Sequence, residues 1–244
     1  MEEEILAVAR EHLGRHGAAA LSLRAVARDM GMASSALYRY IKDRDDLLTL
    51  LIVSAYTSLA ETVEKAHGRV SADDLDGRWR AVGHGLRAWA KRHPHEFALV
   101  YGSPVPDYEA PADRTNEPGT RVQALLVRLL ADAGSAGRLS DAAGVFAPGS
   151  NELAQRAAGH LLDDEFFAGT GLTPETLMAG LAAWTLLLGT VTSELFEQMG
   201  DTVTAPDAYF DYMVEVAGRL VLAPADVTVH SSVSTGFSTD VGKA

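Results

Sequence analysis

Cysteine is absent from this 244-residue chain, which excludes disulfides, thiolate metal sites and thiol nucleophiles. Long apolar runs are absent too. The longest, residues 181–191, contains threonine and glycine and falls well short of the ~20 residues that cross a bilayer. Residues 1–4 lack the basic-then-apolar order of a secretion signal. We therefore expect a soluble cytoplasmic protein with no membrane partner.

Catalytic motifs are also lacking. His93 and His95 are two residues apart, whereas a zinc pair on one helix face needs a spacing of four. Ser103 lies in a Gly-Ser-Pro sequence, which is not the nucleophile elbow of hydrolases, and no glycine-rich phosphate loop is present. We expect no catalytic residue, no metal site and no cofactor, and hence a protein that is not an enzyme.

Acidic residues outnumber basic ones, and a net charge of −12 at first argues against a nucleic-acid partner. The imbalance is not uniform, however. Residues 10–44 hold seven basic side chains against three acidic ones, a local charge of +4, so the rest of the chain carries −16. Because phosphate attraction is short-ranged at physiological salt, such a patch suits sequence-selective DNA binding. A merely solvated surface is the alternative, and the pattern of residues 21–44 decides between the two.

Residues 21–44 predict two short helices joined by a tight turn. Ser22 is a candidate N-cap for the first helix, and Gly31 follows it, where a residue that tolerates positive φ is favoured. The apolar stripe of this helix recurs at helical spacing, at Leu23, Val26, Ala27 and Met30. The second helix is expected over residues 34–41, with Leu37 and Ile41 facing inward. Its other side chains are small, hydroxyl-bearing or basic, as entry into a major groove requires, so the segment predicts a DNA-binding helix-turn-helix.

The letters LYRY at residues 37–40 and DRDDLL at residues 43–48 resemble the DNA-binding domain of TetR-family transcriptional regulators, and the similarity spans about residues 5–52. Arg44 stands where the family usually has lysine, although either side chain reaches a phosphate. Ser35 and Ala36 stand where many members have Gly, Pro or Thr, which leaves the operator sequence open. The resemblance implies a dimer, a ligand pocket, and repression as the mode of regulation.

We expect DNA contacts from eight residues: Arg24, Ser34, Ser35, Ala36, Tyr38, Arg39, Tyr40 and Arg44. Arg39 is the expected base reader, because a guanidinium can bond a guanine edge bidentately. The two serines suit a base edge or a phosphate, and the alanine suits a thymine methyl group. The resemblance assigns Tyr38 to a phosphate. Arg24 and Arg44 are phosphate candidates, with a base edge as the alternative for Arg24, and Tyr40 suits internal packing as well as the DNA backbone.

The expected fold class is all-α, because helical periodicity recurs along the chain and no strand alternation is long enough for a sheet. We expect a helix-turn-helix domain of three helices at 1–46, a larger effector-binding and dimerisation domain at 47–223 and a flexible tail at 224–244. Asp43 is a candidate N-cap for a helix that runs to about His67 and links the domains. Other helices are expected over residues 2–16, 78–93, 95–101, 121–133, 151–162, 174–199 and 206–222, with an irregular loop at 102–119.

The helices expected over residues 174–199 and 206–222 carry enough apolar residues to predict a homodimer surface, and the resemblance supports it. Burial within one chain is the alternative. In a dimer, two reading helices lie about 34–36 Å or a multiple apart on the duplex, which makes the operator an approximate palindrome.

The larger domain contains more residues than a dimer contact alone requires. Seven side chains at helical positions are candidates for lining an effector cavity: Trp89, His93, Phe97, Tyr101, Arg121, His160 and Trp184. Core packing is the alternative for each aromatic residue. With the pocket that the resemblance implies, we expect a small, mostly apolar effector that releases a repressor from its operator. The other interpretation is a regulator whose larger domain docks a protein; a sizeable cavity would favour the small molecule.

Overall fold

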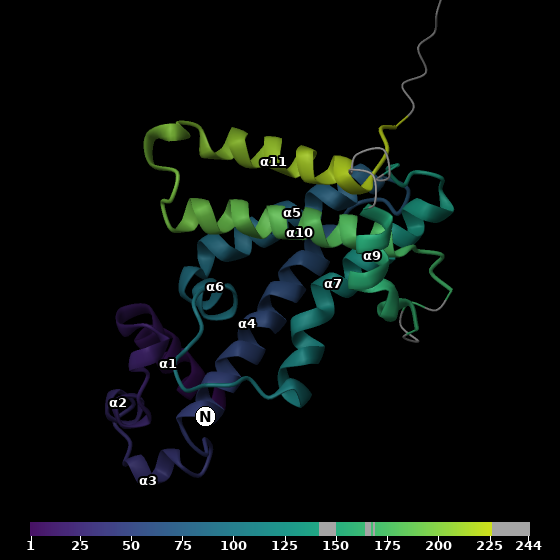
Figure 1. Cartoon of the computed structure of the whole chain (residues 1–244). Coiled ribbons are helices and arrows are strands. Elements are labelled where there is room, and N and C mark those ends of the chain that lie inside the picture. Colours follow the sequence, from purple (N-terminus) through teal and green to yellow (C-terminus); the bar gives the residue numbers. More distant parts are fainter. Residues whose placement is uncertain (142–149, 164–166, 168, 226–244) are drawn as a thin grey trace, which may run out of the picture.

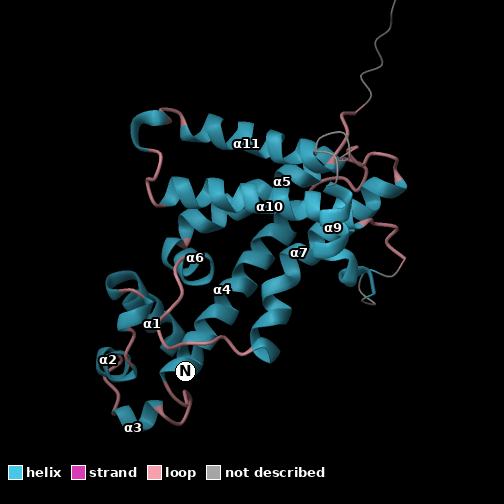
Figure 2. Cartoon of the chain, viewed as in Figure 1, coloured by secondary structure: helices cyan, strands magenta, loops and turns pink. Residues whose placement is uncertain are grey.

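The computed structural model describes residues 1–141, 150–163, 167 and 169–225. These residues form helices joined by loops, without a strand among them, so the expected all-α class is confirmed (Figure 2). The tail expected over residues 224–244 lies outside the described residues from 226 onward. In chain order the elements are α1 (Glu2–His16), η1 (Ala18–Ala20), α2 (Leu23–Asp29), α3 (Ser34–Leu37), α4 (Arg44–His67), α5 (Leu75–Arg92), α6 (Pro94–Tyr101), α7 (Ala112–Ser135), α9 (Ser150–Ala158), η2 (Gly159–Asp163), α10 (Pro174–Leu195), η4 (Gly200–Thr202) and α11 (Pro206–Val221).

The N-terminal unit, which we call the head, consists of α1, α2, α3 and the first turns of α4 (Figure 1). Its core is formed by apolar side chains that lie three or four residues apart on each helix. The completely buried members include Ile5, Ala9, Val26, Ile41 and Leu48. Because this spacing gives each short helix one apolar face, the helices of the head bury a common core although each alone is too short to be stable.

Helix α4 belongs to two cores. Leu48 and Leu51 pack in the head, whereas Ala55 packs in the core of the larger unit. The Asp43 carboxylate accepts a hydrogen bond from the Asp46 backbone N–H at 2.8 Å, which is the N-cap expected from the sequence. The helix then runs unbroken from the head into the larger unit (Figure 1). The domain boundary after residue 46 stays a prediction.

The larger unit, which we call the body, contains the rest of α4 together with α5, α6, α7, α9, α10 and α11. Helices α10 and α11 pack side by side (Figure 1). A polar network fastens both helices to α5. The Arg87 guanidinium donates to Glu194 and to Asp207, each at 2.6 Å. The bonds from Arg87 lower the pKa of the Glu194 carboxyl, so this pair stays charged at neutral pH.

Helix α7 begins at Ala112 and not near Arg121 as expected from the sequence. Pro118 and its neighbouring glycine indicate a helix break, yet Pro118 lies buried inside α7. A proline removes one helical hydrogen bond, and burial of Thr115, Pro118 and Val122 on one face offsets that loss. The expected loop is thus confined to residues 102–111, which we call the strap.

Other helix ends also differ from expectation. Helix α5 begins at Leu75, because the Asp74 carboxylate accepts from the Gly77 N–H at 2.8 Å and caps it. Helix α10 ends at Leu195, before residue 199.

Two helices, α4 and α10, are long and apolar enough to cross a membrane by length and composition alone. Within their most apolar windows, 50% of α4 and 39% of α10 is buried inside the chain. Since α4 lies in both cores and α10 packs on α5, α7, α9 and α11, packing within the protein explains much of this apolar character.

Candidate nucleic-acid interface

The turn between α2 and α3 is closed by Gly31, whose φ of 67° lies in the left-handed region as expected. The Gly31 N–H donates to the Arg28 carbonyl at 3.0 Å, and the Met32 N–H donates to the Ala27 carbonyl at 2.9 Å. These paired bonds form a Schellman end, which terminates α2 and turns the chain toward α3. Ser22 occupies the N-cap position of α2, but its side chain makes no capping hydrogen bond.

The segment of residues 34–41, which begins with α3, is held in the head by its inward side chains. Leu37 is 1% exposed and Ile41 is completely buried, as their spacing predicted. The α-helix ends at Leu37, so it is shorter than the expected span of residues 34–41. The chain nevertheless stays coiled, because the backbone N–H groups of Tyr40 and Ile41 both donate to the Leu37 carbonyl, at 2.9 and 3.1 Å.

The outward side chains of this segment remain free to meet a partner. Tyr38 is 50% exposed and Tyr40 is 45% exposed, which removes internal packing as the interpretation of Tyr40. Arg24, Ser35 and Arg39 are exposed too, while Ser34 and Ala36 are half-buried. Helix α3 lies at the end of the molecule farthest from α11 (Figure 1). The structure therefore presents the expected reading surface, and contact of these residues with DNA stays a prediction.

Arg44 has a structural role that the sequence did not indicate. Its guanidinium donates to the backbone carbonyls of Ala18, Ala19 and Leu21, at 3.3, 3.1 and 3.3 Å. These bonds fasten η1 and Leu21, which precede α2, to the start of α4, and thereby fix the entry of the helix-turn-helix. The expected contact between Arg44 and a phosphate stays a prediction, which must be compatible with these bonds.

A second contact missed in the sequence joins α1 to α2. The buried His12 ring lies 2.7 Å from the Asp29 carboxylate. The hydrogen bond from His12 is the main cause that lowers the pKa of the Asp29 carboxyl. A histidine on an apolar helix face gives no signal of its partner, since Asp29 lies on another helix.

The head is also fastened to the body by side chains far apart in the sequence. Arg10 donates to the Ser54 hydroxyl at 2.6 Å and lies 3.4 Å from the Glu96 carboxylate on α6. From the strap, the Tyr108 hydroxyl bonds the Thr49 hydroxyl at 2.8 Å, and Tyr108 packs on the head core. The strap is therefore a second connection between the two units, beside α4.

A third fastening lies at the start of α7. Arg114 donates to the Asp46 carboxylate at 2.7 Å. Burial opposes ionisation of Asp46, but the Lys42 backbone N–H and Arg114 outweigh it and hold the pKa of this carboxyl below its ordinary value. Helix α7 is thus tied directly to the base of α4.

The structure does not gather the seven expected ligand-binding residues around one cavity. Trp89 and Phe97 are completely buried in the body core, and His93 stacks on Trp89 with the ring centres 5.6 Å apart. Arg121 forms an ion pair with Glu64 at 2.7 Å. Because most faces of a helix inside a bundle meet another helix, aromatic side chains at helical positions usually fill the core.

The other three expected residues are dispersed. His160 is exposed on η2. Tyr101 lines an open cleft of about 610 Å³ between head and body. Trp184 lines a smaller apolar pocket of about 180 Å³ between α7, α9 and α10, together with Leu126 and Phe167. The two hollows share no lining residue.

Comparisons with known proteins agree with this architecture. Residues 5–51 match the family of bacterial regulatory proteins of the tetR type, and residues 79–217 match the tetracyclin repressor-like C-terminal domain. The HTH-type transcriptional regulators Rv1816 of Mycobacterium tuberculosis and Mb1846 of Mycobacterium bovis are each 39% identical over 218 residues, covering 86% of this chain and 88% of theirs.

Solved structures agree as well. The regulatory protein SCO4313 has a TM-score of 0.69 and 31% identity, covering 88% of this chain and 94% of its own. A protein from Rhodococcus sp. RHA1 shares the fold, with a TM-score of 0.66, 21% identity and coverage of 90% and 94%.

A head with an exposed helix-turn-helix, mounted on a larger helical body, defines a DNA-binding transcriptional regulator and not an enzyme. The chain belongs to the TetR family, as both family matches and the mycobacterial relatives show.

Proposed function

We propose that the protein is a dimeric repressor that binds a palindromic operator in the cytoplasm and leaves it when a small, mostly apolar effector binds the body. The segment of residues 34–41, with Tyr38, Arg39 and Tyr40 exposed, supports DNA reading more than any other observation. Its inward pair, Leu37 and Ile41, fixes its orientation, so Arg39 and its neighbours meet the major groove as a rigid unit.

Selection from a random duplex pool tests the DNA proposal. Two copies of one half-site should emerge with opposite orientation, their centres about 10 base pairs or a multiple apart, because each subunit contributes one reading helix. Enrichment of single, unpaired sites would exclude a symmetric dimer on the operator. Recovery of no shared sequence would exclude sequence reading altogether.

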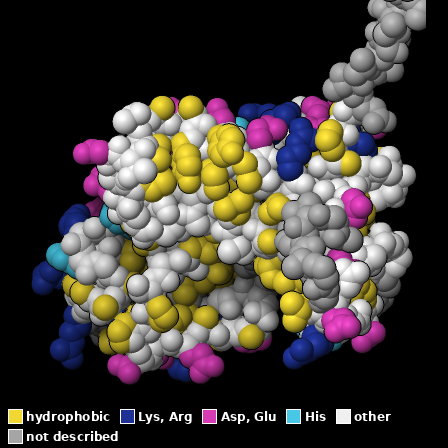
Figure 3. Space-filling model, turned by 45° about the horizontal axis from the view of Figure 1, so that its top comes forward, with side chains coloured by type: hydrophobic (Ala, Val, Ile, Leu, Met, Phe, Trp, Pro, Cys, Tyr) yellow, Lys and Arg dark blue, Asp and Glu magenta, His cyan; other side chains and the backbone are white. Residues whose placement is uncertain are grey.

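The proposed dimer surface is the outer face of α10 and α11. Leu181 is 53% exposed and Tyr212 is 65% exposed. Leu181 lines a shallow hollow between α10 and α11, together with Met178, Tyr209 and Met213. Hydrophobic side chains gather on the face that carries these helices (Figure 3). Large apolar side chains on one face are typical of an interface, so a second copy is the proposed cover.

Sedimentation of variants tests this surface. Leu181→Glu should convert the dimer to a monomer, because two glutamates would be buried against the symmetry-related apolar face. Leu153→Glu is the matched control, since Leu153 is 63% exposed on α9, and it should remain dimeric. A dimer that withstands the change at Leu181 would place the interface elsewhere.

The effector is assigned to the apolar pocket between α7, α9 and α10. Gln123 lines it, and its buried carbonyl oxygen has no hydrogen-bond partner among the described residues. An unsatisfied buried acceptor costs about 1–3 kcal/mol, which a ligand that donates one hydrogen bond would recover. Helix α7 carries Gln123 and also Arg114, which is bonded to Asp46 at the base of α4. A shift of α7 on ligand binding would therefore move the base of α4, and effector and operator would oppose each other reciprocally.

Release of a labelled operator by a library of small apolar compounds tests the effector proposal. Gln123→Leu keeps the pocket apolar and removes the acceptor, so an effective compound should weaken by about tenfold, one lost hydrogen bond. Gln155→Leu, on the exposed side of α9, is the control and should respond as the wild type does. Equal responses in both variants would remove the effector from this pocket.

A further inference from the structure

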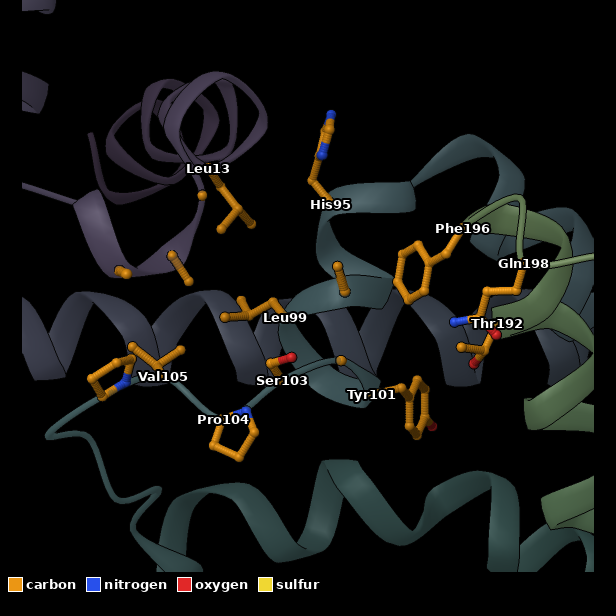
Figure 4. Close-up of a pocket in the computed structure, with 16 residues that line it drawn as sticks. Leu13, His95, Leu99, Tyr101, Ser103, Pro104, Val105, Thr192, Phe196 and Gln198 are labelled. Atoms are coloured by element: carbon orange, nitrogen blue, oxygen red, sulfur yellow. The ribbon is translucent and has the colours of Figure 1, made fainter.

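The cleft between head and body has walls from both units. Leu13 and residues 17–19 form its head side, and Phe196 and Gln198 form its body side. Figure 4 shows Leu13 from α1 facing the strap and Leu99, while Phe196, Thr192 and Gln198 approach from the end of α10. With a volume of about 610 Å³, the cleft is within the usual range of small-molecule sites.

The lining of the cleft selects against charge. The described residues that line it include no Lys, Arg, Asp or Glu. Apolar surface comes from Leu13, Leu99 and Phe196, and neutral hydrogen-bonding groups come from Ser103 and Thr192. A cation entering this cleft would lose water without gaining a counter-charge, and His95 is the one described side chain of the lining that could become a cation to meet an anion, so a neutral molecule is favoured.

The polar groups at the body end can donate to a ligand oxygen. The Gln198 side-chain carbonyl accepts from the Ser193 hydroxyl at 3.3 Å, which leaves the Gln198 amide N–H groups to donate. Tyr101 also lines the cleft. Burial raises the pKa of Tyr101 far above its ordinary value, so the phenol keeps its proton. Its ring is held by Phe97 and Tyr56, with centres 5.2 and 6.1 Å away.

The position of the head at the cleft is set by one close contact. A Cβ atom at Gly14 would lie 2.9 Å from Cδ2 of His95, so α1 and α6 approach as closely as a glycine permits. Head and body are therefore already in contact beside the cleft, at Gly14 and His95. A molecule in the cleft would add further contacts to both units.

We propose that this cleft binds a neutral molecule with an apolar ring skeleton and a carbonyl or ether oxygen, and that the bound molecule bridges head and body. The oxygen lies toward Gln198 and Thr192, and the skeleton lies between Leu13, Leu99 and Phe196. Such a molecule holds the head at the angle seen in this structure, whereas an effector in the apolar pocket acts through α7.

The neutral fluorophore 6-propionyl-2-dimethylaminonaphthalene is a suitable probe, because it has an apolar ring skeleton and carries one carbonyl whose hydrogen bonding shifts its emission. Ala19→Trp fills the cleft from its head side, where Ala19 is exposed, and should weaken probe binding by at least about tenfold. Ala20→Trp is the matched control, because Ala20 is exposed beside it but does not line the cleft, and it should retain the wild-type affinity. Gln198→Leu should weaken binding by about three- to tenfold, the loss of one hydrogen bond.

Hydrogen exchange of the full-length protein then locates the probe. Amides within residues 13–19 and 192–198 should both exchange more slowly when it is bound, since the molecule contacts both sides of the cleft. The proposal would be overturned if exchange slowed only in the body, or if the Ala19→Trp variant bound the probe as the wild type does. Absence of saturable binding would also overturn it. Gln123→Leu should leave probe binding unchanged, which separates this cleft from the proposed effector pocket.

Discussion

The head and the body are both built from amphipathic helices, but they differ in the distance along the chain over which their contacts form. The buried side chains of the head core come from residues 5–51, and their inward positions follow from spacing within each helix, while the partly buried Leu99, Val105 and Tyr108 pack against this core from outside. The body joins helices far apart: the Trp79 indole N–H donates to the Val214 carbonyl at 2.9 Å across 135 positions. Local pattern therefore determines the head, whereas the hollows of the body depend on how distant helices meet.

The largest expected effect is in the body. Trp89 is completely buried, and its indole N–H donates to the Ser58 hydroxyl at 3.1 Å. Trp89→Ala should lower the free energy of unfolding by about 3–5 kcal/mol, because it leaves a cavity and an unpaired hydroxyl. Urea unfolding followed by circular dichroism measures this, with the exposed Leu153→Ala as control. A loss as small as that of the control would show that the body repacks freely.

The corresponding change in the head separates the two units. Leu37→Ala should destabilise the head by about 2–5 kcal/mol and abolish operator binding, since Leu37 anchors α3. Hydrogen exchange should rise in residues 23–41 and stay unchanged in residues 79–90. If both segments lost protection together, the head and body would form one cooperative unit and the comparison would fail.

Within the head, the exposed side chains should affect DNA binding without affecting stability. Arg39→Ala should cost about 1–3 kcal/mol of binding free energy at one operator base pair, if its guanidinium reads a guanine edge. Fluorescence anisotropy against operators substituted one position at a time gives the profile. A uniform loss over all these operators would assign Arg39 to the phosphate backbone.

The strap connects the two units and should contribute less to the stability of the head than the buried Leu37 does. Tyr108→Phe removes the hydroxyl that bonds Thr49 and should lower the stability of the head by about 0.5–1.5 kcal/mol. Leu153→Ala, on the exposed side of α9 and outside the proposed dimer surface, is the control. The readout is the exchange rate of amides in residues 44–51. Identical rates in the two variants would show that the strap does not hold the head.

The smallest expected effect depends on pH. Because the pKa of Asp29 is lowered in the folded head, its ion contributes stability above the ordinary value of 3.8, and this contribution is lost as the pH falls through the lowered folded pKa. Asp29→Asn should therefore flatten the acid limb of head stability below about pH 4. Thermal melts of the wild type and the variant from pH 2.5 to 7 measure the stability of the head. Both proteins keep Asp43, so the cap of α4 is the same in each. If the acid limb were unchanged in the Asp29→Asn variant, ionisation of Asp29 would not contribute to the pH dependence of head stability.

The sequence predicted much of the head. Gly31 ends α2 and Asp43 caps α4, because both act through bonds within a few residues. The start of α7 was missed, since buried contacts on one helix face outweigh the local preference of Pro118. The seven ligand candidates were dispersed for a related reason: sequence indicates that a side chain such as Trp89 or Phe97 turns inward, but not whether it meets another side chain or a cavity. The structural role of Arg44 was missed for the same reason, because its carbonyl partners lie more than twenty positions away in the sequence.

The central claim is that the head recognises DNA sequence, and it is tested most directly by a ratio of two affinities. The selected palindrome and a scrambled duplex of the same length and composition are titrated with the wild-type dimer at 0.15 M salt. The account predicts that the palindrome binds at least about a thousandfold more tightly. Equal affinity for the two duplexes would contradict it.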